Sequence, residues 1–120
     1  MKIMLVDDDH ATGLSLTRAL MGDYVVNLVT DAQTALNVAK AYTYDLILLN
    51  SMMANLDSTQ LCKRLRNDGY EGLIFTLSRG SGAETQEDCL RSMNVGADAC
   101  MTHPYEVKEL LAKLHRLLNP

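Results

Sequence analysis

The sequence has little basic charge, no long apolar run and no paired cysteine motif, and each shortage excludes a class of protein. Its 11 lysines and arginines face 15 acidic residues, for a net charge of −4, so it lacks the basic surface of a nucleic-acid-binding domain. No apolar run approaches the roughly 20 residues that span a bilayer. Met1–Val6 leads into acidic residues instead of a signal-peptide cleavage site. We therefore expect a cytoplasmic domain that itself contacts neither membrane nor nucleic acid.

The three cysteines, Cys62, Cys89 and Cys100, are odd in number and widely spaced. Without a CxxC pair, they give no sign of a zinc site or of dithiol chemistry. We expect reduced, mostly packed thiols.

Five apolar segments alternate with stretches of helical periodicity, which is the pattern of βα units built on a parallel sheet. The predicted strands are Lys2–Val6, Tyr24–Val29, Asp45–Leu49, Leu73–Leu77 and Ala99–Met101. The third is apolar without alternation, so we expect both of its faces to be covered. At 120 residues, 48% hydrophobic and without a linker or repeat, the chain forms one domain over residues 1–120.

Apolar residues at helical spacing predict the helices that cover this sheet. The clearest two sets are Ala32, Ala35, Leu36 and Ala39, and Val107, Leu110, Leu111 and Leu114. Thr30 with Gln33 predicts a capping box for the second helix, and Gly69 predicts the end of the third. Pro104 stands just before the fifth.

Polar residues follow the apolar segments, where ligand sites of open α/β sheets lie. They are Asp7, Asp8 and Asp9, then Asn50 and Ser51, then Ser78, and finally Thr102 and His103. Adjacent carboxylates repel one another, so the first cluster indicates a compensating cation or basic side chain. A solvated acidic loop would have the same sequence.

Several ordered motifs share one known pattern. They are Ile3–Asp9, Tyr44–Leu49, Met52–Met53 with Leu56–Asp57, Gly96–Asp98, and the Thr102–Pro104 turn before Lys108–Leu111. In these motifs the chain resembles the receiver domains of bacterial two-component response regulators, in particular the receiver half of winged-helix transcription factors. The resemblance implies a flavodoxin-like (βα)5 fold, a doubly wound parallel sheet of strand order 2-1-3-4-5. It also implies that the chain is the N-terminal part of a longer response regulator.

In that family, an aspartate after the third strand accepts a phosphoryl group beside Mg²⁺, and the transfer depends on positioning and charge compensation. The resemblance makes Asp7 and Asp8 the acidic pair and gives the metal the backbone carbonyl of Met52. It places Asn50 at the phosphoacceptor position. A neutral amide can neither form an acyl phosphate nor give the metal a full charge. We therefore expect no required cofactor, and weak Mg²⁺ binding at most.

The switch positions of the family also depart from its pattern. Ser78 keeps a hydroxyl that would contact the phosphoryl group, but Arg79 replaces a small residue and Cys100 an aromatic one. His103 replaces a lysine, so this position loses a permanent positive charge, because an ordinary histidine has a pKa of about 6.5. Ala54 replaces a proline. We interpret the chain as an atypical receiver, a pseudo-receiver without catalytic residues and not an enzyme.

The favoured function is a phosphorylation-independent signalling module that controls transcription through protein contacts. Its partners would be a histidine kinase, its own effector domain or another regulator. Glu109 and Lys113 match charged positions of the face on which such domains pair, formed by the fourth helix, fifth strand and fifth helix. Cys89 and Ala99 stand where their charged partners are typical, so a homodimer would need other contacts. Glu109 and Lys113 could equally form an i, i+4 pair on a solvated helix.

Other functions remain open. A divalent transition metal could bind a ligand set of Asp7, Asp8, His103 and His10. Without a metal, carboxylates beside His103 would favour its charged form and create a pH sensor. Phosphorylation could return if Asn50 deamidates or if Ser51 is modified. An unrelated hydrolase has no support from a Ser/His/Asp order, a Gly-rich phosphate loop or an HExxH motif.

Overall fold

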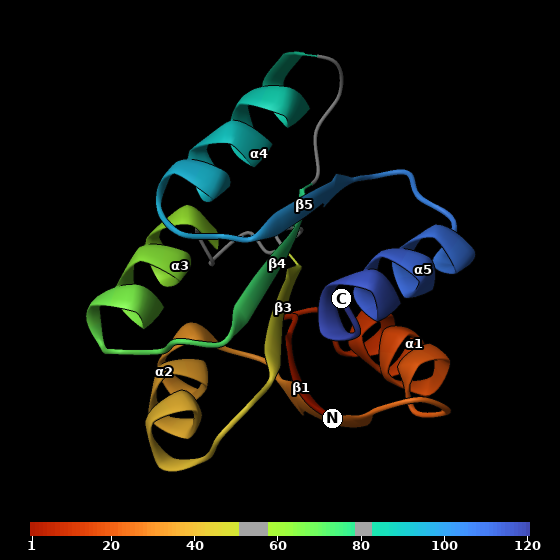
Figure 1. The fold of residues 1–120 in the computed structure, drawn as a ribbon, viewed down its shortest axis with the longest axis horizontal. Coiled ribbons are helices and arrows are strands. Elements are labelled where there is room, and N and C mark those ends of the chain that lie inside the picture. Colours follow the sequence, from red (N-terminus) through yellow and green to blue (C-terminus); the bar gives the residue numbers. More distant parts are fainter. Residues whose placement is uncertain (51–57, 79–82) are drawn as a thin grey trace.

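Five parallel strands alternate with five helices along the chain (Figure 1). The computed structural model describes residues 1–50, 58–78 and 83–120, of which 83–86 and 88 by their backbone alone. The elements are β1 (Lys2–Val6), α1 (His10–Leu20), β2 (Val25–Val29), α2 (Ala32–Ala41), β3 (Leu46–Asn50), α3 (Ser58–Asn67), β4 (Leu73–Ser78), α4 (Ala83–Asn94), β5 (Ala99–Thr102) and α5 (Val107–Leu118). The strand order β2-β1-β3-β4-β5 confirms the predicted flavodoxin-like fold.

Helices cover both faces of the sheet, with α1 and α5 on one side and α2 and α3 on the other (Figure 1). Side chains of one strand alternate between the two cores: Ile47 and Leu49 join the α2–α3 side, and Leu46 and Leu48 join the α1–α5 side. Every residue of β3 is buried. The prediction of a central strand covered on both faces is therefore confirmed.

The predicted cap of the second helix was wrong by one residue, and one predicted core position of the fifth helix is exposed. The cap of α2 is Asp31, whose carboxylate accepts the Thr34 N–H at 2.8 Å, so Thr30 is not the cap. Val107 begins α5 but is 43% exposed, while Leu110, Leu114 and Leu118 form its buried face. Val107 is the first residue of α5 and has exposed neighbours on both sides, so it lies beyond the part of the helix that packs on the sheet.

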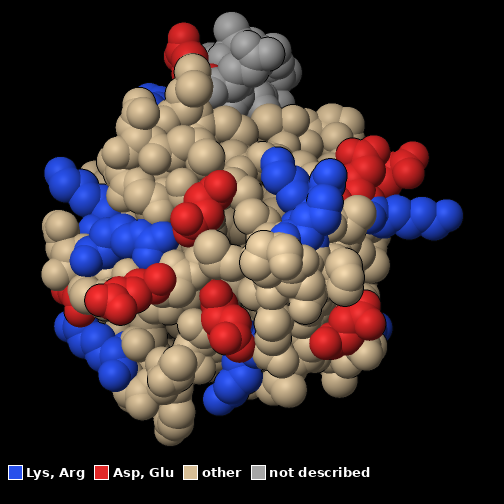
Figure 2. Space-filling view, viewed as in Figure 1, with Lys and Arg blue, Asp and Glu red and all other residues tan. Residues whose placement is uncertain are grey.

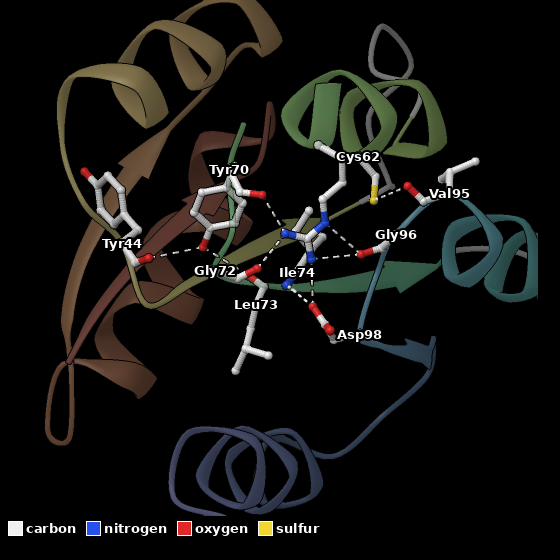
Figure 3. Close-up of polar contacts among 10 residues, drawn as sticks. Tyr44, Cys62, Tyr70, Gly72, Leu73, Ile74, Val95, Gly96 and Asp98 are labelled. Carbon is white, nitrogen blue, oxygen red and sulfur yellow. Dashed lines mark hydrogen bonds and ion pairs between the residues drawn. The ribbon is translucent and has the colours of Figure 1, made fainter. Parts of the chain in front are cut away.

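The Gly96–Asp98 motif fixes the turn between α4 and β5 (Figure 3). The Arg66 guanidinium of α3 donates to the carbonyl oxygens of Tyr70, Gly72 and Gly96 and to the Asp98 carboxylate, at 2.7 to 3.0 Å. Gly96 has a φ of +117°, in the region that favours glycine. Arg66 thus ties together the two turns that lead into β4 and β5. The predicted end of α3 is also confirmed, because Gly69 follows it with a φ of +97°.

Acidic and basic side chains are interspersed over the face seen in Figure 2, which carries no broad basic patch. Among the residues that the structure describes, no helix is long and apolar enough to span a bilayer.

Candidate functional site

The carboxyl ends of the central strands bring Asp7, Asn50 and Ser78 to one edge of the sheet. Asp7 follows β1, Asn50 ends β3 and Ser78 ends β4, and all three are at most 2% exposed. The strands are parallel neighbours, so their last residues converge. Asn50 Nδ2 donates to Asp7 Oδ2 at 2.8 Å, across 43 positions of sequence. The predicted grouping of these residues is therefore present.

Asp7 is a buried carboxylate with both oxygens engaged. Its Oδ1 accepts the Asp9 N–H at 2.9 Å, and its Oδ2 accepts from Asn50. Burial raises the pKa of Asp7 above its usual value, these two hydrogen bonds oppose the rise, and the charges of Asp9 and Asp8 add to it. The Asn50 amide thus helps keep a costly buried charge in place.

The turn after β5 adds an aromatic residue to this edge. The His103 N–H donates to the Ser78 carbonyl at 2.9 Å, and a cis peptide joins His103 to Pro104. The rings of His103 and Tyr105 lie 4.7 Å apart between centroids. Burial raises the pKa of Tyr105, and the negative charge of Asp7 raises it further. Tyr105 therefore lies within electrostatic reach of Asp7, a proximity that the sequence did not reveal.

A disulfide joins Cys89 of α4 to Cys100 of β5, with 5.5 Å between the Cα atoms. The expectation of reduced thiols is therefore wrong for these two cysteines, because the α4–β5 turn brings them together. Ser78 Oγ lies 3.4 Å from the Cys100 sulfur and 3.8 Å from the Cys89 sulfur. A disulfide has no hydrogen to donate, so the hydroxyl is the donor. Cys62 is a buried free thiol, as expected.

Residues 3–115 match the model of the response regulator receiver domain family. The chain belongs to this family. It is 34% identical over 114 residues to the nisin biosynthesis regulatory protein NisR of Lactococcus lactis subsp. lactis, covering 94% of this chain and 48% of that protein. It is 33% identical over 120 residues to the response regulator MprA of Mycobacterium avium (strain 104), covering 99% and 51%. The receiver domain thus spans about half the length of these curated relatives.

Solved structures share the fold of this receiver domain. The Francisella response regulator 1452 receiver domain superposes with a TM-score of 0.85 at 24% identity, covering 98% of this chain and 95% of that one. At this identity, the likeness concerns the fold alone.

The residues of this receiver domain do not fit the magnesium site that its family implies. Both oxygens of Asp7 already accept hydrogen bonds, one of them from the Asn50 amide, which brings no charge. Asp8 is exposed. Within residues 1–50, 58–78 and 83–120, no three His, Cys, Asp or Glu side chains form a group that could hold a metal ion. The set of Asp7, Asp8, His10 and His103 is therefore not assembled as a transition-metal site.

Glu109 and Lys113, which the sequence predicts on a pairing face, differ in their contacts. Lys113 Nζ donates to the Cys100 carbonyl at 3.1 Å and lies 5.7 Å from the centroid of the Phe75 ring. Glu109 is exposed, and the ion pairs found among the described residues do not include one between it and Lys113. The alternative of a solvated i, i+4 pair is therefore wrong, because Lys113 binds β5. The pairing face itself stays a prediction.

Met52, with its proposed carbonyl ligand, and Arg79, at the second switch position, lie outside the described residues. The same is true of Ser51 and Ala54. Their roles stay predictions.

Proposed function

We propose that this receiver domain is an atypical, phosphorylation-independent signalling module that works in the cytoplasm through protein–protein contacts. The observation that carries the proposal is Asn50, buried at the end of β3 with its amide nitrogen 2.8 Å from Asp7 Oδ2. An amide nitrogen carries no attacking lone pair comparable to that of a carboxylate oxygen, and this one is directed at Asp7. The hydrogen bond also replaces the compensating cation that a buried carboxylate otherwise needs. The domain thereby keeps its scaffold without phosphoryl chemistry or a required metal.

The output of the module, in this proposal, is control of transcription by a winged-helix DNA-binding domain that lies outside residues 1–120. Two observations support it: the chain covers 48% and 51% of two curated relatives named as regulators, and its own net charge is −4. Contacts to DNA would then come from the remaining half of the protein. The partners of the receiver domain would be a histidine kinase, that effector domain or another regulator.

A homodimer through α4, β5 and α5 is the contact that the surface supports best. Leu90 and Met93 of α4 and Val107 of α5 are 63%, 44% and 43% exposed. Leu90 and Met93 line one groove with Leu117 of α5, and exposed apolar side chains gathered in this way favour protein contact. Analytical ultracentrifugation of the wild type and of Leu90→Glu tests this: a dimer that the substitution dissociates supports it, and a monomeric wild type contradicts it.

Intact-mass spectrometry tests the loss of phosphorylation. Fresh protein is incubated with Mg²⁺ and acetyl phosphate, alongside Asn50→Asp, which restores a carboxylate at the same position. We expect an unchanged mass for the wild type. A gain of one phosphoryl group by the wild type would overturn the proposal. A starting mass raised by the difference between amide and acid would indicate deamidation, and a peptide digest would then test whether it lies at Asn50.

A second candidate function is pH sensing at His103. It is favoured by the contact of its ring with Tyr105, a residue that lies within reach of the Asp7 charge. A nearby carboxylate stabilises a protonated imidazole. NMR titration of His103 in the wild type and in Asp7→Asn decides the question, since coincident titration curves would show that the carboxylate does not act on the imidazole.

A further inference from the structure

The described side chains of helix α4 bury little apolar surface. Of its side chains that the structure describes, Glu87 and those of residues 89–94, only Ser92 is buried. Leu90 and Met93 point their apolar surface to solvent, with 63% and 44% exposed. Neither of the two core clusters includes any of these side chains. Figure 1 shows α4 at the periphery, beside β5. A helix with so few buried apolar contacts opens locally at low cost.

The Cys89–Cys100 disulfide is the covalent attachment of this helix. Its Cα atoms are 5.5 Å apart, close to the most common separation of bridged cysteines. The backbones of α4 and β5 therefore already lie where the bond forms. Both cysteines are partly exposed and line a groove of about 310 Å³ on the surface. We therefore expect a small reagent in this groove to reach the two cysteines.

The electrostatic surroundings separate these cysteines from the third one. The Lys113 ammonium lies in the same groove and donates to the Cys100 carbonyl at 3.1 Å. A nearby positive charge favours the thiolate, which is the reactive form of cysteine. Cys62 is fully buried, and burial raises its pKa. Cys62 therefore serves as an internal control of low expected reactivity beside the pair Cys89 and Cys100.

The disulfide also touches the edge of the sheet where Asp7 and Asn50 lie. The Ser78 hydroxyl is 3.4 Å from the Cys100 sulfur and 3.8 Å from the Cys89 sulfur. In the disulfide these sulfurs only accept, whereas free thiols also donate. Oxidation or reduction of the two sulfurs thus changes both the attachment of α4 to β5 and the hydrogen-bond partners of Ser78.

We propose that Cys89 and Cys100 form a reversible redox site that fixes α4 to β5 when oxidised and releases it when reduced. The oxidant is a low-molecular-weight disulfide. One cysteine thiolate attacks it, forms a mixed disulfide and releases one thiol. The second cysteine thiolate then attacks the mixed disulfide, so the Cys89–Cys100 bond forms and a second thiol leaves. The two electrons lost by the cysteines reduce the small disulfide to two thiols, and reduction by small thiols reverses each step.

The cytoplasmic location that we propose for this domain favours a regulatory disulfide over a permanent structural one. Thiol systems keep most cytoplasmic cysteines reduced, so disulfides found there are usually transient and redox-sensing. The inference otherwise stands apart from phosphorylation, because its chemistry does not involve Asn50. Its failure and the failure of the proposed function are therefore distinguishable.

Native alkylation tests the chemistry. Wild-type protein equilibrated in glutathione buffers of graded ratio is treated with iodoacetamide without denaturant and weighed intact. We expect no alkyl group at the oxidising end, two at the reducing end, and a reversible transition between them. Cys62→Ser, which keeps a donor for the Val95 carbonyl, should behave alike. Alkylation of Cys89 and Cys100 at every ratio, or at none, would overturn the proposal.

Hydrogen exchange tests the consequence for the fold. Peptides from α4 of the wild type are compared in oxidised and reduced protein, with peptides from α2 as the reference. We expect exchange in α4 to accelerate at least about tenfold on reduction, with α2 unchanged. Cys89→Ser should exchange at the fast rate in both buffers. Equal exchange of α4 in the oxidised and reduced wild type would show that the bond does not hold the helix.

Discussion

Replacing Asn50 with aspartate should destabilise the domain in the absence of a divalent cation. The two side chains have nearly the same shape, so packing is preserved. The change removes the Nδ2 donor that lies 2.8 Å from Asp7 Oδ2 and puts a second carboxylate oxygen against the first. Both positions are fully buried, so water cannot separate the two charges.

The size of the effect follows from two contributions. A hydrogen bond to a charged group contributes about 1.5 to 3 kcal/mol. Two charges roughly 4 Å apart repel by about 4 kcal/mol at an effective dielectric constant near 20. The contributions do not add fully, because the pair can retain one shared proton. We expect a loss of about 4 kcal/mol at pH 7, or roughly 16 °C in melting temperature for a domain of this size.

Thermal unfolding followed by circular dichroism checks the prediction, in EDTA and in millimolar Mg²⁺. Asn50→Asp should melt lower than the wild type in EDTA, and Mg²⁺ should restore it. The shared proton raises the pKa of the pair above its unfolded value, so the variant loses stability as pH rises from about 4 towards 7 and regains it as pH falls. Asn50→Leu, which adds no charge, should not respond to Mg²⁺. Equal melting of Asn50→Asp and wild type in EDTA would refute the reasoning.

Three further predictions concern the scaffold. Asp31→Ala should lower the melting temperature at pH 7. Hydrogen bonds lower the pKa of Asp31 in the folded state, so the stability that Asp31 contributes is lost as pH falls. The melting temperatures of the variant and the wild type should therefore converge below about pH 4. Gly96→Ala should cost about 2 to 3 kcal/mol in urea unfolding, because its φ is positive and its Cβ would lie 2.8 Å from Arg66. Gly69→Ala, with a positive φ but no close neighbour, should cost about 1 kcal/mol; equal costs would contradict a role for Arg66. Lys113→Met should cost about 1 kcal/mol through the lost bond to β5, and an unchanged urea midpoint would contradict it.

The strands were predictable because burial on two faces leaves a strong mark in the sequence. The first segment, Lys2–Val6, has the same bounds in the structure, and the third is shifted by one residue to Leu46–Asn50. Helix starts were less predictable because Thr30 and Asp31 are both good caps. The choice rests on which residue has an extended backbone, and that is Asp31, with φ −146° and ψ 158°.

The same difference applies to the site: contacts that follow from the order of the strands were predictable, and contacts that depend on how closely elements approach in space were not. Strand ends predicted that Asp7 and Asn50 would meet, since parallel strands align their carboxyl ends. The contact between Tyr105 and His103 depends on the path of the chain through the turn after β5. The disulfide depends on how closely α4 approaches β5. Two cysteines separated by 11 positions carry no such information, so the sequence suggested packed thiols instead.

The departures from the family pattern are physically consistent with one another. At the end of β3, Asn50 satisfies the buried Asp7 with a neutral hydrogen bond, which in our proposal takes the place of a cation. At the end of β4, Ser78 contacts sulfur atoms that belong to α4 and β5. The hydroxyl that the resemblance assigns to the phosphoryl group therefore contacts the Cys89–Cys100 bond, for which we propose redox control. If both proposals hold, a scaffold without its phosphoacceptor keeps a chemical input at the same edge of the sheet, and this input acts on α4 through its bond to β5.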